Sequence, residues 1–187
     1  MGIANPIGDM DKEQKNQIAY HEAGHAIAQY YLRPDERIVH LTITRRTQAL
    51  GFMLPVSLVD IYTMPLDTMV RDIMISLAGH VGTEVALGKA WTGASGDLVN
   101  VRGRIMQLAT FGFFGTFLLG EQPSEKMKDT INHFLDDCLE KTKILLEKHR
   151  SELDALVVAL LDRSDLSGLE VVEIIKRTGV YGEITQV

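Results

Sequence analysis

The sequence predicts a mainly α-helical domain of about six helices, with one small β-hairpin and a helical bundle in its C-terminal part. Most of the chain falls into long segments in which apolar residues recur every three to four positions, as they do on one face of a helix. β-branched residues concentrate instead in two short neighbouring segments, which is typical of a hairpin. A length of 187 residues suits a single domain.

The first half of the chain is expected to hold one long helix followed by the hairpin. The helix runs from Asp11 to Leu32, since it carries an apolar stripe and Pro34 follows its end. The strands are expected over Ile38–Thr44 and Ala49–Leu54, with a turn between them. Two strands alone are marginally stable, so the hairpin must pack against helices.

The rest of the chain is expected to be helical. Pro65 opens a second helix that Gly88 terminates, because proline suits a helix start and glycine a helix end. Ser167 and Glu170 form a capping box for the last helix. The remaining helices are expected over 98–111, 124–150, 151–163 and 168–177. Residues 1–10 are expected to be a flexible lead-in, 11–112 the core, and 113–187 a helical part of the same domain.

Composition excludes several functional classes. A net charge of −6 argues against nucleic acid as a partner, since phosphate binding needs clustered basic residues. Cys138 is the one cysteine, so neither an internal disulfide nor a cysteine metal cluster is available. No GxxxxGK[ST] loop is present for ATP. No membrane span is expected, because the most apolar run, Ile105–Leu119, is shorter than the roughly 18 residues required.

The stretch "YHEAGHA" in the first helix indicates metal chemistry. His21 and His25 are four positions apart, so both imidazoles lie on one helix face and can reach a single ion. Glu22 is placed to reach a water on that ion as a general base, which is the physical content of the HExxH pattern. The alternative is that these are helix-surface residues that match the pattern by chance.

A catalytic zinc site needs a third protein ligand and one open position. The residues alone leave four candidates for it, which are His40, His80, Glu84 and Asp97. Asp97 stands at the start of the third helix, where a carboxylate also has a simpler role in complementing the helix dipole. Spacing by itself does not choose among the four.

"HEAGH", followed some seventy residues later by "TGASGDL", resembles the peptidase domain of the FtsH-type ATP-dependent zinc metalloprotease family. The similarity runs from about Ile18 to Gly112. It implies an HExxH-type zinc metallopeptidase fold in which His21, His25 and Asp97 bind zinc and Glu22 is the catalytic base. It also implies polypeptide substrates that add as a strand beside 49–54, and a homo-oligomer, for which a hexamer is the expected size.

The chain departs from that family in several ways. Members carry membrane-spanning segments and an ATPase module before the peptidase domain, and these 187 residues contain neither. The chain is therefore expected to be either an excised domain or a free-standing relative that works with a separate ATPase. Its expected location is the cytoplasm, with membrane association through a missing segment or a partner. His80 stands where the family has arginine, Thr83 where it has an acidic residue, and Gly96 where it has asparagine.

Two functional hypotheses follow. The first is a zinc endopeptidase that hydrolyses unfolded or flexible polypeptides with Glu22 as general base. The second is a metal-binding interaction module of little activity, which assembles with an ATPase partner or acts as an oligomeric scaffold. Metal content together with a cleavage assay separates them.

Overall fold

The computed structural model describes residues 11–44, 51–57, 63–89, 91, 95–115 and 124–184. Within these residues the chain forms six helices and three short strands, which confirms the predicted mainly α fold with its hairpin. The predicted lead-in at 1–10, the turn at 45–48 and most of the predicted loop at 112–123 lie outside the described residues. In chain order the elements are α1 (Lys12–Leu32), β1 (Glu36–Thr42), β2 (Phe52–Ser57), α2 (Leu66–Leu87), α3 (Ser95–Thr110), α4 (Glu125–Lys148), α5 (Arg150–Arg163), β3 (Asp165–Ser167) and α6 (Gly168–Ile184).

The helix ends follow the capping chemistry of the sequence. The Asp11 carboxylate accepts a hydrogen bond from the amide of Gln14 at the start of α1. Gly88 ends α2 in the left-handed conformation with φ of 64°, a conformation that glycine adopts without steric cost. The expected capping box of α6 is confirmed, since the Ser167 amide donates to the Glu170 carboxylate at 2.8 Å.

The sheet has one strand more than the sequence predicts. β1 pairs antiparallel with β2 on one side and with β3 on the other, so the strand order is β2-β1-β3. β3 has only three residues, which is too short for an alternating pattern to be recognised. The predicted second strand is displaced, because the observed one continues through Pro55. Proline is tolerated there because, among the strands that the structure describes, β2 lies at the edge of the sheet.

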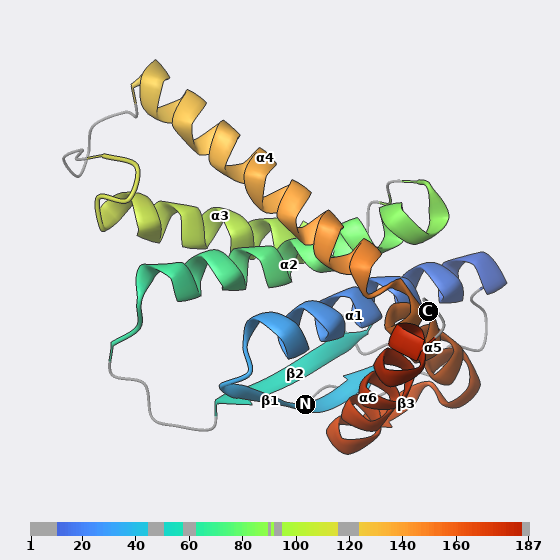
Figure 1. Cartoon of the computed structure of the whole chain (residues 1–187). Helices are drawn as coiled ribbons and strands as arrows, with labels where there is room; N and C mark the ends of the chain where they lie inside the picture. Colours follow the sequence, from blue (N-terminus) through green and yellow to red (C-terminus); the bar gives the residue numbers. More distant parts are fainter. Residues whose placement is uncertain are drawn as a thin grey trace.

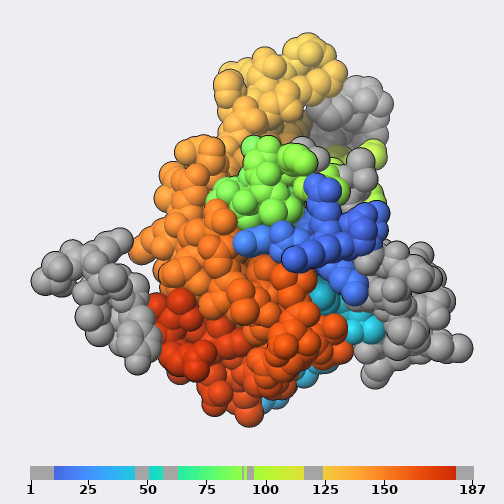
Figure 2. All heavy atoms as spheres, turned by 90° about the vertical axis from the view of Figure 1, so that its right-hand side faces the viewer, coloured from blue at the N-terminus to red at the C-terminus, as the bar shows by residue number. Residues whose placement is uncertain are grey.

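The layers are stacked around α1 and α2. In Figure 1 the sheet lies under α1, α2 lies on the other side of α1, and α3 and α4 lie beyond α2. One apolar core joins α1, β1 and part of α2 to α5 and α6, and the other joins α2 to α3 and α4. Figure 2 shows the start of α1 lying between the end of α2 and α5.

Two polar contacts fix α5 against this end of α1 and α2. The Tyr20 hydroxyl donates to Asp154 at 2.9 Å, and the Arg150 guanidinium donates to the Val85 carbonyl at 3.1 Å. None of the helices in the part of the chain that the structure describes is both long and apolar enough to cross a membrane.

Candidate metal centre

The histidine pair lies where α1 approaches α2 most closely. Gly24, between the two histidines, permits this approach, since a Cβ at that position would lie 2.3 Å from the Ala78 carbonyl oxygen. Gly79 on α2 faces the imidazoles directly. A Cβ there would lie 2.5 Å from Nε2 of His25 and 2.6 Å from Cε1 of His21. The two glycines therefore bring a second helix backbone up against the rings and restrict where they can point.

A backbone carbonyl orients one of the two rings. Nδ1 of His25 lies 2.7 Å from the Ile75 carbonyl oxygen. Because a carbonyl only accepts, Nδ1 carries the proton and donates, and Nε2 keeps a free lone pair. Such a hydrogen bond on the far nitrogen is the usual way in which a metal-binding histidine is held in orientation.

The structure brings Asp97 of α3 to this pair of histidines. One carboxylate oxygen, Oδ2, lies 3.1 Å from Nε2 of His21 and 3.4 Å from Nε2 of His25. The two Nε2 atoms are 3.2 Å apart, and the ring planes are nearly perpendicular at 89°. Three donor atoms from two helices thus converge on one point.

These distances suit a zinc ion. Two donors bound tetrahedrally at about 2.0–2.1 Å from zinc lie roughly 3.3–3.4 Å from each other. The three observed separations, 3.1, 3.2 and 3.4 Å, are close to that value. Two imidazole nitrogens and one carboxylate oxygen also form a donor set that zinc accepts, with a fourth position left for solvent. Among the described residues, His21, His25 and Asp97 form the one group able to hold a metal ion in this way.

Charge in the site is balanced between the carboxylate and the rings. Burial favours the neutral form of Asp97, but the interactions of its carboxylate with the two imidazoles outweigh this, and its pKa lies well below the usual range. Burial alone would lower the pKa of His25, whereas the Asp97 and Glu22 carboxylates raise it, and the net shift is upward. Asp97 is therefore ionised and ready to bind a cation.

Glu22 is buried beside the centre, with an exposed fraction of 6%. Burial raises the pKa of its carboxyl group, and the two nearby imidazoles offset part of this rise. The start of β2 packs onto the same carboxylate, since a Cβ at Gly51 would lie 2.8 Å from Oε1 of Glu22. Glu22 thus lies between the histidines and the edge strand.

The other three third-ligand candidates are located elsewhere. Nε2 of His40 lies 3.0 Å from the Asp165 carboxylate, across the β1–β3 pair. His80 and Glu84 face each other on the partly exposed side of α2, with 4.0 Å between their nearest charged atoms. None of the three belongs to the group formed by His21, His25 and Asp97.

Sequence reasoning missed the roles of Gly79 and Gly51. A helix-interior glycine costs about 1 kcal/mol relative to alanine, so Gly79 offered a signal for a close approach. Gly51 offered little, because glycine near a strand end has many explanations.

The fold is mainly α-helical, and the histidine pair of one helix meets a carboxylate from another, which is an arrangement suited to a metal-dependent hydrolase. The chain belongs to peptidase family M41, whose family model matches residues 9–117. This confirms the resemblance drawn from the two motifs.

Named relatives extend the similarity beyond the family model. The chain is 29% identical to ATP-dependent zinc metalloprotease FtsH 2 of Methylacidiphilum infernorum, over 89% of this chain and 30% of the relative. It is 29% identical to ATP-dependent zinc metalloprotease FtsH of Rickettsia bellii, over 91% of this chain and 30% of the relative. The ATP-dependent zinc metalloprotease FtsH of Thermotoga maritima is 25% identical, over 84% of this chain and 30% of the relative. The chain therefore spans about 30% of the length of these curated relatives.

Proposed function

We propose that this chain is a zinc-dependent endopeptidase that hydrolyses peptide bonds of unfolded or flexible polypeptides. The observation that carries the proposal is the convergence of His21, His25 and Asp97 on one point beside the buried Glu22. Membership of family M41 and the names of the relatives support zinc as the metal.

In this proposal His21, His25 and Asp97 hold the ion, and Glu22 handles protons. When bound, zinc supplies a Lewis acid that acidifies a water molecule and polarises the carbonyl of the scissile bond. Glu22 takes a proton from the attacking water and then delivers it to the leaving amine. The Ile75 carbonyl keeps the His25 ring in place throughout, because it accepts a hydrogen bond from Nδ1–H.

We propose that the substrate binds as an extended strand beside β2. Among the described strands, β2 pairs only with β1, so its other edge has no strand partner there. Leu54 and Val56 are each nearly half exposed and alternate along β2, as side chains that contact an added strand would. Gly51, just before β2, packs against the Glu22 side chain, so a peptide bound along β2 would pass close to the proposed base.

Strand addition requires an extended substrate, and folded proteins are therefore expected to resist cleavage. The relatives are named ATP-dependent, and the chain covers under a third of them. We propose that a separate ATPase partner or another segment supplies unfolding, and that the peptidase works as a homo-oligomer such as a hexamer. We place it in the cytoplasm or at the membrane surface through such a partner.

The test is cleavage of casein by zinc-loaded protein, compared with the Glu22→Gln variant. Glutamine is nearly isosteric with glutamate but cannot take the proton, so the variant should retain zinc and lose cleavage. Glu84→Gln serves as a control, since Glu84 lies on the partly exposed side of α2 and outside the metal group. Wild-type protein that holds one zinc per chain and cuts no unfolded substrate would contradict the proposal.

The alternative is a weakly active interaction module, and exposed apolar side chains on α3 favour it. These side chains lie along the helix and just after it, at Leu98, Val99, Met106 and Phe111. Light scattering with and without an added ATPase, together with the casein assay, separates an assembly that cleaves from one that does not.

A further inference from the structure

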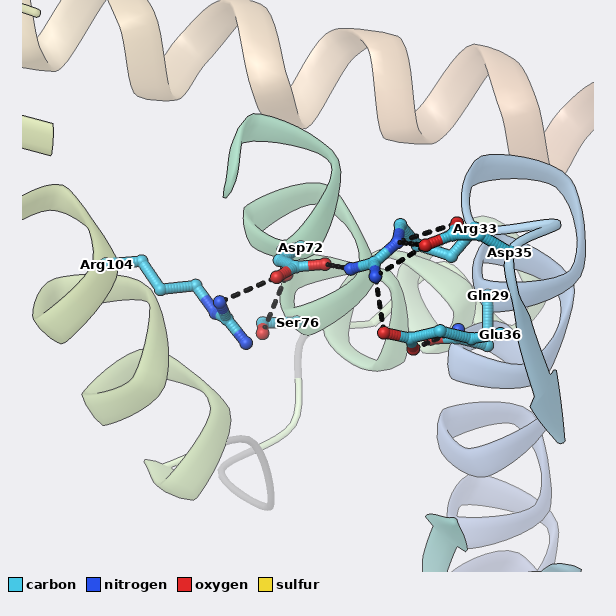
Figure 3. Close-up of polar contacts among 7 residues, drawn as sticks. All are labelled: Gln29, Arg33, Asp35, Glu36, Asp72, Ser76 and Arg104. Atoms are coloured by element: carbon cyan, nitrogen blue, oxygen red, sulfur yellow. Dashed lines mark hydrogen bonds and ion pairs between the residues drawn. The ribbon is translucent and has the colours of Figure 1, made fainter. Parts of the chain in front are cut away.

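Asp72 joins three helices through a partly buried ion-pair network, here called the Asp72 bridge and formed by the buried Arg33 and Asp72 together with the partly exposed Arg104. The carboxylate of Asp72, on α2, has an exposed fraction of 9%. Its Oδ1 accepts from the guanidinium of Arg33 at the end of α1, and its Oδ2 accepts from Arg104 of α3 at 2.7 Å. Figure 3 shows Asp72 between the two guanidinium groups.

The bridge is better suited to fixing geometry than to stabilising the fold. Removing charges from water costs nearly as much as their attraction returns, so a buried ion pair contributes little net stability. Its hydrogen bonds are nevertheless short and directional. Arg33 is also held by Asp35 and Glu36, which leaves it little freedom to follow a displaced Asp72.

The three helices that the bridge joins are the ones that build the metal centre. α1 carries His21 and His25, α2 presses Gly79 against their rings, and α3 carries Asp97. Arg104 follows Asp97 by seven residues, which is about two helical turns or roughly 10 Å, and the two side chains lie on the same helix face. The bridge and the centre are therefore two attachment points of one face of α3.

Apolar packing alone leaves the first turn of α3 weakly constrained. Ser95, Gly96, Leu98 and Val99 are exposed, and the first buried residue of the helix is Val101. The apolar cluster shared by α2, α3 and α4 contains Met69 and Met74, whose flexible side chains adapt to small displacements. The buried apolar contacts of α3 therefore begin only after its first turn. A directional ion pair adds a constraint on the axial position of the helix.

We propose that Arg104 is a positioning residue for the metal centre. Acting through Asp72, it fixes the axial position of α3 and so holds the Asp97 carboxylate at the 3.1–3.4 Å from the imidazole nitrogens that zinc requires. This inference rests on the zinc site proposed above. It assigns a role to residues that lie about two turns away from the ligands.

The test measures zinc affinity by competition with a chromophoric chelator, without any activity assay. Arg104→Met keeps the length and the apolar stem of the side chain but removes the ion pair. We expect it to weaken zinc binding about 10–100-fold, the usual effect of losing a group that orients a ligand. Arg104→Lys, which keeps a charge, should restore part of the affinity. Arg102→Met is the matched control, because Arg102 is exposed on the same helix.

A second background separates positioning from general destabilisation. In the Asp97→Ala protein only the two imidazoles remain to bind zinc weakly, and α3 no longer supplies a donor. Arg104→Met should then leave zinc affinity unchanged. An equal loss in both backgrounds, or no loss in the wild-type background, overturns the positioning role. Partial unfolding of Arg104→Met is checked by circular dichroism, and the comparison then uses Arg104→Gln.

The outcomes for the two proposals are distinct. If zinc affinity depends on both Asp97 and Arg104 but the wild type cleaves nothing, the proposed function fails and the positioning role stands. If the wild type binds zinc and cleaves casein but its zinc affinity does not depend on Arg104, only the positioning role fails. A wild type that binds no zinc overturns both.

Discussion

Replacement of Gly79 by alanine is the most direct test of the geometry of the metal centre. The new Cβ would lie 2.5 Å from Nε2 of His25, and 2.6 and 2.7 Å from Cε1 and Nδ1 of His21. Ordinary contacts between such atoms are about 3.5–4.0 Å, so both rings must retreat by roughly 1 Å. Separating the helices to make room would also open the close contact of α2 with Gly24 on the same face.

A retreat of this size is large compared with the tolerance of a zinc site, where bond lengths vary by about 0.2 Å. We expect Gly79→Ala to weaken zinc binding at least about 100-fold. The zinc-free protein should lose about 1–3 kcal/mol from overpacking, offset by up to about 1 kcal/mol from the better helix propensity of alanine. Metal affinity should therefore fall far more than the stability of the zinc-free fold.

The assay pairs chelator competition for zinc with thermal unfolding in the presence of a chelator. Gly103→Ala is the control, since Gly103 is also inside a helix and a Cβ there meets nothing within 4 Å. It should stabilise the protein by about 0.5–1 kcal/mol and leave zinc affinity unchanged. Wild-type zinc affinity in Gly79→Ala would refute the packing of α2 against the imidazoles.

Three further predictions concern other parts of the molecule. Gly51→Ala should lower kcat about 100-fold with zinc retained, because the new Cβ would displace the Glu22 carboxylate. Metal analysis together with casein cleavage checks this, and an unchanged kcat would contradict it. Gly168→Ala should destabilise the fold by about 3 kcal/mol or more, since the new Cβ would lie 1.7 Å from the Ile38 carbonyl oxygen. Urea unfolding measures this, and a loss of unfolding free energy under about 1 kcal/mol would count against it. Burial raises the pKa of Glu152, but the hydrogen bonds from His149 and Ser151 lower it by a larger amount. The pKa of Glu152 in the folded protein therefore lies below 4.5. Its contribution is present above about pH 4.5 and is lost as the pH falls through the lowered pKa, so Glu152→Gln should cost about 1–2 kcal/mol at pH 7 and progressively less as the pH falls below about 4.5. A cost independent of pH would exclude this linkage.

The fold was largely predictable because its helices carry strong local signals. The apolar stripe of α1, the glycine that ends α2 and the capping box of α6 each act within a few residues, and each is found in the structure. β3 was not predictable, since three residues gain strand structure only by pairing with β1. The predicted second strand, Ala49–Leu54, was displaced from the observed Phe52–Ser57 for a related reason. Proline disfavours a central strand, and only the sheet order shows that Pro55 lies at an edge.

The candidate site divides in the same way between local and tertiary information. The spacing of His21 and His25 is a property of one helix, so the sequence alone indicates that both rings face one ion. Asp97 lies more than seventy residues away, and its approach to the rings depends on how α3 packs on α2. Four third-ligand candidates remained until the resemblance favoured one of them.

The same distinction explains why the sequence suggests only a salt bridge or a substrate contact for Arg104, and not a link between three helices. An arginine in an amphipathic helix is ordinarily solvated or paired with a neighbour one turn away. Here its partner is Asp72 on another helix, and that partner also binds Arg33 of a third. A constraint shared by three helices has no signature in any one of them, yet it acts on the distance between Asp97 and the histidines. Zinc affinity that depends on Arg104 only when Asp97 is present would be the measurable consequence of that shared constraint.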